Sequence, residues 1–197
     1  MLKRIGEVPL FVSIAETKRR IHFEGAADEE NDDIELMLRA AARRVEQRTG
    51  RILALGQFEY RFDCWSDCMV LPIAPVRVVT GVAYLDVDHV EQEVPAADWY
   101  ETIGDRDARV TMVDGFSQPE LSARGGQVIV RFDAGYDTPD ASGSGDDPAL
   151  ERDPMDVQAV LMLVAHWWLN RSAVGATSME TTPQGFEDLV AEQRIYR

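Results

Sequence analysis

At 197 residues, the chain is long enough for one domain with a substantial core or for two small layers around it. Its hydrophobic share of 45% is ordinary for a globular protein, but its formal net charge of −15 is not. Proteins that grip DNA neutralise phosphates with clustered Lys and Arg, so this charge argues against a DNA-binding protein and leaves two interpretations open: solubility, or acidic walls past which DNA slides.

Two helices are predicted in the N-terminal region. Ser13 and Glu16 have the spacing of a capping box, in which the hydroxyl accepts a backbone N–H and the carboxylate reaches back to the cap, so a helix is expected near 13–22. A second helix is expected near 32–49, where apolar residues recur at helical spacing: Ile34, Leu38, Ala41 and Val45. Gly50 then stands where helices commonly end in a left-handed conformation.

Residues 57–136 show the period of two that is typical of strands, and Pro and Gly residues interrupt the runs. This pattern predicts five to seven short antiparallel strands. The following stretch, 137–153, is rich in Gly, Ser, Pro and acidic residues and has no periodicity, so we expect an acidic flexible loop there.

The stretch 154–171 predicts a core helix. Pro154 suits a first helical turn, because its missing N–H has no intrahelical partner there. One face is expected to lie in the core: Val157, Leu161, Val164 and Trp168. The uncharged run 157–170 is shorter than the about 20 residues of a membrane span, so we expect this helix to be buried in protein.

The C-terminal stretch predicts one more short helix, near 183–193. Its apolar face is small and consists of Phe186, Leu189 and Val190. Helices shorter than about 12 residues are marginal in water, so this face is not expected to hold the helix firmly. The sequence continues with Arg194, Ile195, Tyr196 and Arg197.

Taken together, the elements predict an α+β protein, in which a small helical bundle carries an inserted antiparallel β-rich subdomain. The expected parts, in chain order, are a first helical segment, the β-rich insertion, the acidic loop, and the core helix with the C-terminal docking segment. Their ranges are 1–56, 57–136, 137–153 and 154–197.

Motifs for catalysis or metal binding are not found in the sequence: it has no nucleophile elbow, phosphate-binding loop or zinc-protease motif. Cys64 and Cys68 are the only cysteines, and we expect them to be reduced and structural. With few histidines to complete a site, we expect no metal and no cofactor. The carboxylates near Asp86 resemble a strand end running into a turn, where acids are common, and a small cytosolic enzyme that uses them is the alternative from a different functional class.

Several short motifs occur in order along most of the chain. They are Val12-Ser-Ile-Ala-Glu-Thr-Lys18, Val45-Glu-Gln-Arg-Thr-Gly-Arg51, Leu71-Pro-Ile-Ala-Pro-Val76, the Ala-Gly-Tyr that ends at Tyr136, Trp-Leu-Asn-Arg171 and Tyr196-Arg197. Together they resemble the head–tail connector (adaptor) proteins of long-tailed bacteriophages and of phage-derived gene transfer agents. The loop 137–153 departs from the family pattern, in which a shorter link is expected.

The resemblance implies a structural protein and no enzyme. Such proteins assemble as a ring, commonly of twelve copies, beneath the portal at the capsid vertex, where the ring extends the DNA channel and presents a platform to the tail. The implied partners are the portal protein, a head-closure or tail-completion protein and further copies of the chain. DNA would pass through without specific binding, and no membrane is involved. The implied location is the head–tail interface of a virion or phage-like particle, after assembly in the bacterial cytoplasm.

A head-closure or tail-completion role is the alternative within structural proteins. The resemblance also implies that the C-terminal segment orders on the portal or on a neighbouring subunit, and Tyr and Arg side chains suit such a contact. The residues expected to dock are Phe186, Leu189, Val190, Arg194, Ile195, Tyr196 and Arg197. Deletion of 183–197 is then expected to leave the fold intact while abolishing attachment.

Overall fold

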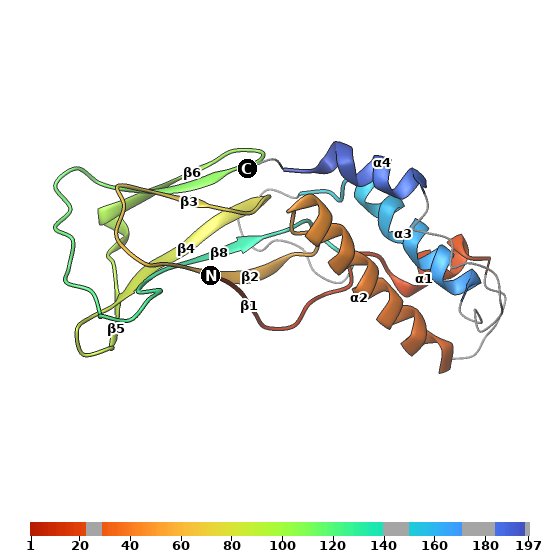
Figure 1. Ribbon diagram of the computed structural model, residues 1–197, viewed down its shortest axis with the longest axis horizontal. Helices are drawn as coiled ribbons and strands as arrows, with labels where there is room; N and C mark the ends of the chain where they lie inside the picture. The colour runs from red at the N-terminus through yellow and green to blue at the C-terminus, as the bar shows by residue number, and fades with distance from the viewer. Residues whose placement is uncertain (23–28, 140–149, 171–183, 196–197) are drawn as a thin grey trace. The chain divides into compact units, whose positions relative to one another are not determined.

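The computed structural model describes residues 1–22, 29–139, 150–170 and 184–195. It confirms the predicted α+β class, with four α-helices and eight strands in two antiparallel sheets within these ranges (Figure 1). The chain divides into two compact units. The β unit contains Met1–Val8 and Leu55–Gly135, and the helical unit contains Pro9–Ala54 and the described residues from Tyr136 onward.

The helical unit contains all four predicted helices. Their bounds are α1 Ile14–Arg20, α2 Glu29–Thr49, α3 Pro154–Leu169 and α4 Gln184–Gln193. Arg171 and Pro183, which were expected at helix ends, lie outside the described residues, as does most of the predicted loop 137–153. No helix within the described ranges has the length and hydropathy needed to cross a membrane.

The end of α2 follows the local sequence signals closely, and the start of α1 follows them in part. The Ser13 hydroxyl accepts the N–H of Glu16 at 3.1 Å, as a cap should. The Glu16 carboxylate does not complete the predicted capping box, because it pairs with Arg152 at 3.1 Å. Gly50 has a φ of 74° and donates its N–H to the Glu46 carbonyl at 2.9 Å, so it ends α2 in the expected left-handed conformation.

The core of the helical unit lies between α2, α3 and α4. The predicted apolar stripe of α2 is buried, with Ile34, Leu38, Ala41 and Val45 each at most 2% exposed. On α3, Leu161 and Val164 are buried, whereas Val157 and Trp168 are only partly buried against the core. The fully buried part of α3 extends to residues outside the expected face, which are Ala159, Val160 and Leu163. The difference follows from packing, because α2 and α4 both contact this apolar helix.

The β unit holds two sheets. The five-stranded sheet has the order β1-β2-β8-β4-β5, and the three-stranded sheet has the order β3-β7-β6. The strand bounds are β1 Leu2–Ile5, β2 Gly56–Phe62, β3 Cys68–Leu71, β4 Val76–Leu85, β5 Glu91–Glu93, β6 Trp99–Ile103, β7 Ala108–Met112 and β8 Val128–Ala134. A short 3₁₀ turn, η1 (Ala96–Asp98), precedes β6. Seven of these strands, β2 to β8, lie in the region for which five to seven were expected, and β1 lies before it.

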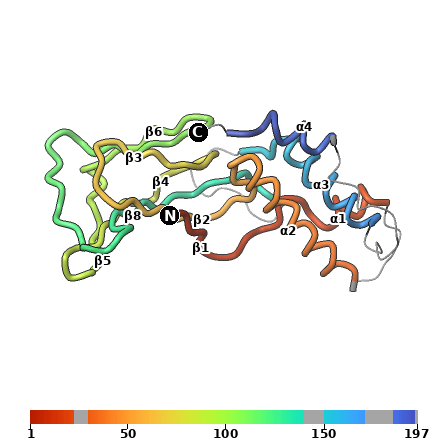
Figure 2. Tube along the Cα trace, viewed as in Figure 1, coloured from red at the N-terminus to blue at the C-terminus, as the bar shows by residue number. Residues whose placement is uncertain are grey.

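The extra strand at the N-terminus changes the expected division of the chain. β1 pairs antiparallel with β2, with Leu2 opposite Tyr60 and Ile5 opposite Gln57, although more than 50 residues separate them (Figure 2). The first residues therefore belong to the β unit and not to the helical segment expected over 1–56. A run of four residues is too short to show a strand period, so only the partner strand reveals it.

The interior of the β unit is apolar and close-packed. The central strand β8 is buried along most of its length, and the Phe132 ring stacks on Phe58 of β2 with centroids 5.9 Å apart. Met69 and Leu71 of β3 and Val110 of β7 are at most 1% exposed. Aromatic pairs of this kind add to the burial of their surface, so this cross-strand pair stabilises the five-stranded sheet.

Candidate functional site

The segment predicted to dock on a partner begins inside the core of its own helical unit. Phe186 is fully buried and Val190 is 3% exposed, and both belong to the main apolar cluster with α2 and α3. Leu189 is partly buried against the same cluster. The expectation that this face is free for a partner is therefore wrong for Phe186 and Val190. The burial of these side chains also contradicts the expectation that deletion of 183–197 leaves the fold intact, because the deletion would remove Phe186 and Val190 from the core.

The residues after α4 are held against the end of α2. The N–H of Ile195 donates to the Thr49 carbonyl at 2.8 Å, and the Ile195 side chain is partly exposed. The Arg194 side chain is exposed. Tyr196 and Arg197 lie outside the described residues. Of the predicted docking residues with described side chains, Arg194 and Ile195 are thus placed after the last helix and outside the apolar core.

A partly buried arginine joins the segments that surround this point. The Arg51 guanidinium lies 3.0 Å from the Asp156 carboxylate and 3.5 Å from that of Asp153, and its side chain is 12% exposed. It also donates a hydrogen bond to the Gln193 side chain and lies over the Tyr136 ring, 5.2 Å from its centroid. Arg51 follows α2, the two aspartates stand at the start of α3, and Gln193 ends α4, so one side chain links the ends of three helices.

The local sequence explains how Arg51 reaches this position. Gly50 turns the backbone at the end of α2, and the N–H of Arg51 then donates to the Thr49 hydroxyl at 3.2 Å. Asp153 caps α3 by accepting the N–H of Met155 at 2.9 Å, and Asp156 lies in the first turn of that helix, where a negative charge is favoured. Both carboxylates and the Gln193 side-chain oxygen lie close to the same guanidinium nitrogen, Nη1.

The environment of Asp156 perturbs its titration. Burial, the largest influence, raises the pKa of the Asp156 carboxyl, the positive charge of Arg51 lowers it, and the negative charge of Asp153 raises it. The net result is a pKa of about 6, against 3.8 for the ordinary carboxyl. A shift that burial dominates is the usual behaviour of a carboxylate removed from water. The cluster is a structural ion pair at the junction of the helices, and its geometry serves to hold the C-terminal segment.

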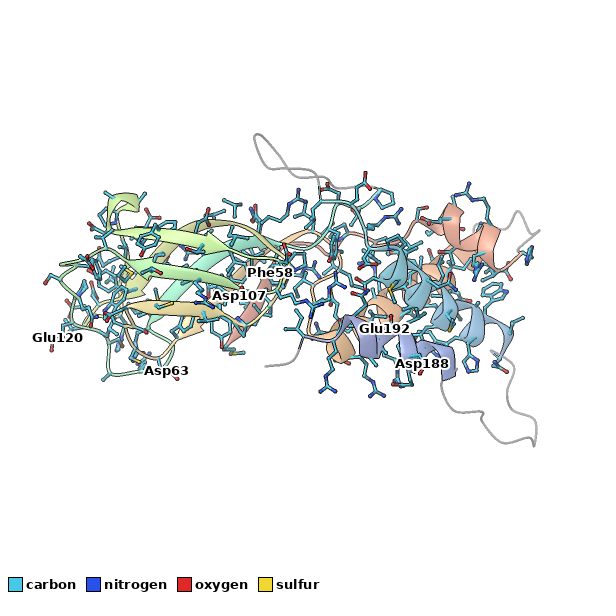
Figure 3. All side chains as sticks on the ribbon, turned by 90° about the horizontal axis from the view of Figure 1, so that it is seen from above. Phe58, Asp63, Asp107, Glu120, Asp188 and Glu192 are labelled. Atoms are coloured by element: carbon cyan, nitrogen blue, oxygen red, sulfur yellow. The ribbon has the colours of Figure 1, made fainter. Side chains whose placement is uncertain are left out.

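The exposed side of α4 is acidic. Asp188 and Glu192 lie one turn apart on this side and point away from the core (Figure 3). Glu187 is partly exposed and pairs with Arg48 of α2 at 3.2 Å. Arg43 of α2 lies 3.6 Å from Glu46, so two arginines in the C-terminal half of this helix have acidic neighbours.

The carboxylates near Asp86 form a turn and not a reaction site. The Asp86 carboxylate accepts the N–H groups of Asp88 and Val90, each at 3.0 Å, and the side-chain amide of Gln92 at 2.9 Å. The bond from Gln92 contributes most to the lowering of the Asp86 pKa, followed by that from Val90. These contacts close the β4–β5 hairpin. Among the described residues no group of three or more His, Cys, Asp or Glu side chains could hold a metal ion, and Cys64 and Cys68 are exposed free thiols.

Solved structures similar to this chain come from particles of gene transfer agents. The chain matches one in the neck of an empty gene transfer agent (GTA) particle, computed with C6 symmetry, with a TM-score of 0.75 and 28% identity; the match covers 100% of this chain and 96% of that one. A chain in the virion of a native GTA particle gives a TM-score of 0.74 at the same identity and coverage. A chain in the neck of a native particle, computed with C12 symmetry, gives 0.71 at 27% identity.

The chain is similar to a neck protein of gene transfer agents. This similarity spans its whole length and confirms the resemblance predicted from the ordered motifs. No family model matches the chain, and no curated protein matches it.

Sequence reasoning did not single out Arg51. Its burial depends on carboxylates about 100 residues away in the chain, and one arginine after a helix-ending glycine carries no local signal of burial. The only available hint was Asp153 and Asp156 flanking the proline at the start of α3, which places two acids close together on one helix end.

Proposed function

We propose that this protein is a structural component of the neck of a gene transfer agent or related phage particle. The observation that carries the proposal is the full-length structural match to a chain of a GTA neck, at a TM-score of 0.75 and with 100% and 96% of the two chains covered. A match of this coverage at 28% identity concerns the whole chain and not one shared motif. The proposed role is structural, and the protein is not an enzyme.

Within the neck, we assign the protein to a ring of identical copies beneath the portal. The C6 and C12 symmetry of the similar assemblies supports a homo-oligomeric ring, and twelve copies is the number we propose. The ring would extend the DNA channel, contact the portal on one side and a head-closure or tail-completion protein on the other, and provide the platform for the tail. The net charge of −15 suits a wall past which DNA slides, since like charge prevents sticking.

The C-terminal segment is the proposed attachment point to the portal or to a neighbouring subunit. Arg194 and Ile195 support this role, because both follow the last helix at the surface of the helical unit. Tyr196 and Arg197 complete the segment in sequence. Phe186, Leu189 and Val190 act indirectly in this proposal, because they fix α4 in the core and so position the residues that follow.

The proposal is tested by removing the protein from the particle-producing cell. We expect heads without tails in electron micrographs of the lysate, and expression of the wild-type chain in the same strain should restore tailed particles. A second strain should express the chain without residues 194–197, a deletion that leaves α4 in place. That strain should contain soluble, folded protein but tailless heads. Normal numbers of tailed particles in the absence of the protein would contradict the neck assignment.

A further inference from the structure

The five-stranded sheet of the β unit has two free edges of opposite charge. β1 forms one edge and pairs only with β2, whereas β5 forms the other and pairs only with β4, as far as the described residues show. β1 contributes Lys3 and Arg4, and β5 has the sequence Glu-Gln-Glu. Lys3 and all three residues of β5 are exposed.

A row of alternating charges crosses the same sheet and ends at these edges. Lys3 of β1 stands opposite Glu59 of β2, and Glu59 stands opposite Arg131 of β8 at 3.7 Å between charged atoms. Arg131 also reaches Glu91 of β5 at 2.5 Å. Residues that stand opposite in register share one face of a sheet, so the row runs positive, negative, positive, negative from β1 to β5.

We propose that the β1 edge of one copy docks on the β5 edge of the next copy in the ring. This inference rests on the proposed function, because it requires copies that repeat around an axis. A ring needs two different surfaces that fit each other, and β1 and β5 are such a pair within one sheet. Lys3 of one copy then continues the charge row of its neighbour at Glu91 and Glu93.

The charges also set which edges can meet. Two β1 edges would bring positive side chains together and two β5 edges negative ones, and like charges directly opposite each other are unfavourable between strands. Only the β1–β5 combination is attractive, so the contact runs head to tail. Protection of exposed edges against aggregation would need charge at each edge but not charge of opposite sign.

The register of the sheet places the interacting side chains within reach. The pairing across the sheet relates both edges to positions on β2. Lys3 stands opposite Glu59 of β2. Glu93 stands opposite Ala83, Ala83 opposite Ile129, and Ile129 opposite Arg61 of β2. With the same register continued across the contact between two copies, Lys3 and Glu93 are offset by two residues along the strand. Diagonal neighbours of this kind are still within reach of long side chains.

Cross-linking on purified particles tests the contact directly. A carbodiimide joins an amine to a carboxylate with no spacer, and peptide mass spectrometry identifies the joined residues. Within one copy, β1 and β5 are four strand spacings apart, or about 19 Å, which is too far for such a bond. A Lys3–Glu93 or Lys3–Glu91 link must therefore join two copies. We expect it in assembled particles and not in dilute monomer.

Charge reversal supplies the second test. Lys3→Glu and Glu93→Lys should each weaken association by about fivefold per contact, because an attractive cross-strand pair becomes a repulsive one. The double variant Lys3→Glu/Glu93→Lys should recover association. A mixture of the two single variants should recover it too, because a ring in which they alternate again joins opposite charges at every β1–β5 contact. Arg106→Glu and Glu120→Lys are the controls, since they make the same charge changes at exposed turn positions of the β unit (Figure 3 labels Glu120).

Incorporation of each variant into particles, measured as copies per head, is the readout. Particles that contain the wild-type protein in their neck but yield no such cross-link, together with single variants incorporated as well as the controls, would overturn the edge contact and leave the proposed function standing. Absence of the wild-type protein from the particles would refute the proposed function and the contact with it. Recovery in the double variant is not expected from a general effect of net charge.

Discussion

The helical unit and the β unit place their charged residues in different ways. The helical unit takes one ion pair into its interior, where Arg51 is 12% and Asp156 only 1% exposed on the side chain. The β unit carries a row of charges along a sheet face. Glu59 in the middle of the row is only 10% exposed on the side chain, but the Arg131–Glu91 pair at its end is 31% and 40% exposed. Loss of one partner should therefore be costly for the Arg51–Asp156 pair and almost silent for the exposed Arg131–Glu91 pair, because desolvation decides the penalty.

The largest expected effect is the loss of the buried arginine. Arg51→Met should lower the free energy of unfolding by about 3–5 kcal/mol, since it leaves the Asp156 carboxylate buried without its cation. The double variant Arg51→Met/Asp156→Asn removes both charges and should recover most of that loss. Urea unfolding measures both values, and Arg43→Met, an exposed arginine of α2, is the control. Equal stability of the two Arg51 variants would contradict the buried-pair interpretation.

Packing in α3 should give the next largest effect. Leu163 is 1% exposed, whereas Leu169 on the same helix is 80% exposed. Leu163→Ala should cost about 2–5 kcal/mol, because a buried leucine leaves a cavity, and Leu169→Ala should change stability by less than about 0.5 kcal/mol. Thermal unfolding of the two variants, which make the same chemical change, checks the assigned core face. Similar melting temperatures would show that the face is wrong.

The pH dependence of stability should be smaller and should come from Asp156. Its pKa is about 6 in the folded protein, against 3.8 for the ordinary carboxyl, so the folded state binds this proton more tightly than the unfolded chain does. As pH falls from about 7 to 4, this group should therefore add stability, by about 1–3 kcal/mol.

The Asp156→Asn variant isolates that contribution. The difference in unfolding free energy between this variant and the wild type should change across pH 4–7 in the direction just given, while other groups cancel in the comparison. A difference that stays constant over this range would mean that Asp156 titrates near its ordinary value.

The smallest effect is expected at the exposed end of the charge row in the β unit. Glu91→Gln removes the carboxylate that pairs with Arg131, but both side chains are partly exposed. The change should lower the free energy of unfolding by about 0.2–1 kcal/mol, as is usual for exposed pairs. Measurements in dilute protein at low and high salt should show the small loss shrinking with salt. A loss as large as that of Arg51→Met would remove the contrast between the two units.

Local sequence patterns were enough to predict much of the fold. The α2 stripe from Ile34 to Val45, the Ser13 cap and the Gly50 end follow from interactions within a few residues of each other, and they appear as expected. The antiparallel strands between 57 and 136 were likewise predicted from a period of two. The ordered motifs led to the correct structural relatives, because they are spread over most of the chain.

The tertiary structure alone decided where α4 and β1 belong and which charges meet. Phe186 and Val190 looked too few to hold a helix, but α2 and α3 supply the surface that buries them. β1 became a strand because β2 offers an edge. The register that sets Lys3 opposite Glu59 and the ion pair of Arg51 with Asp156 join residues far apart in the chain. A periodic pattern reports only on neighbours three or four positions away in a helix or two in a strand, so such long-range partners leave no trace in it.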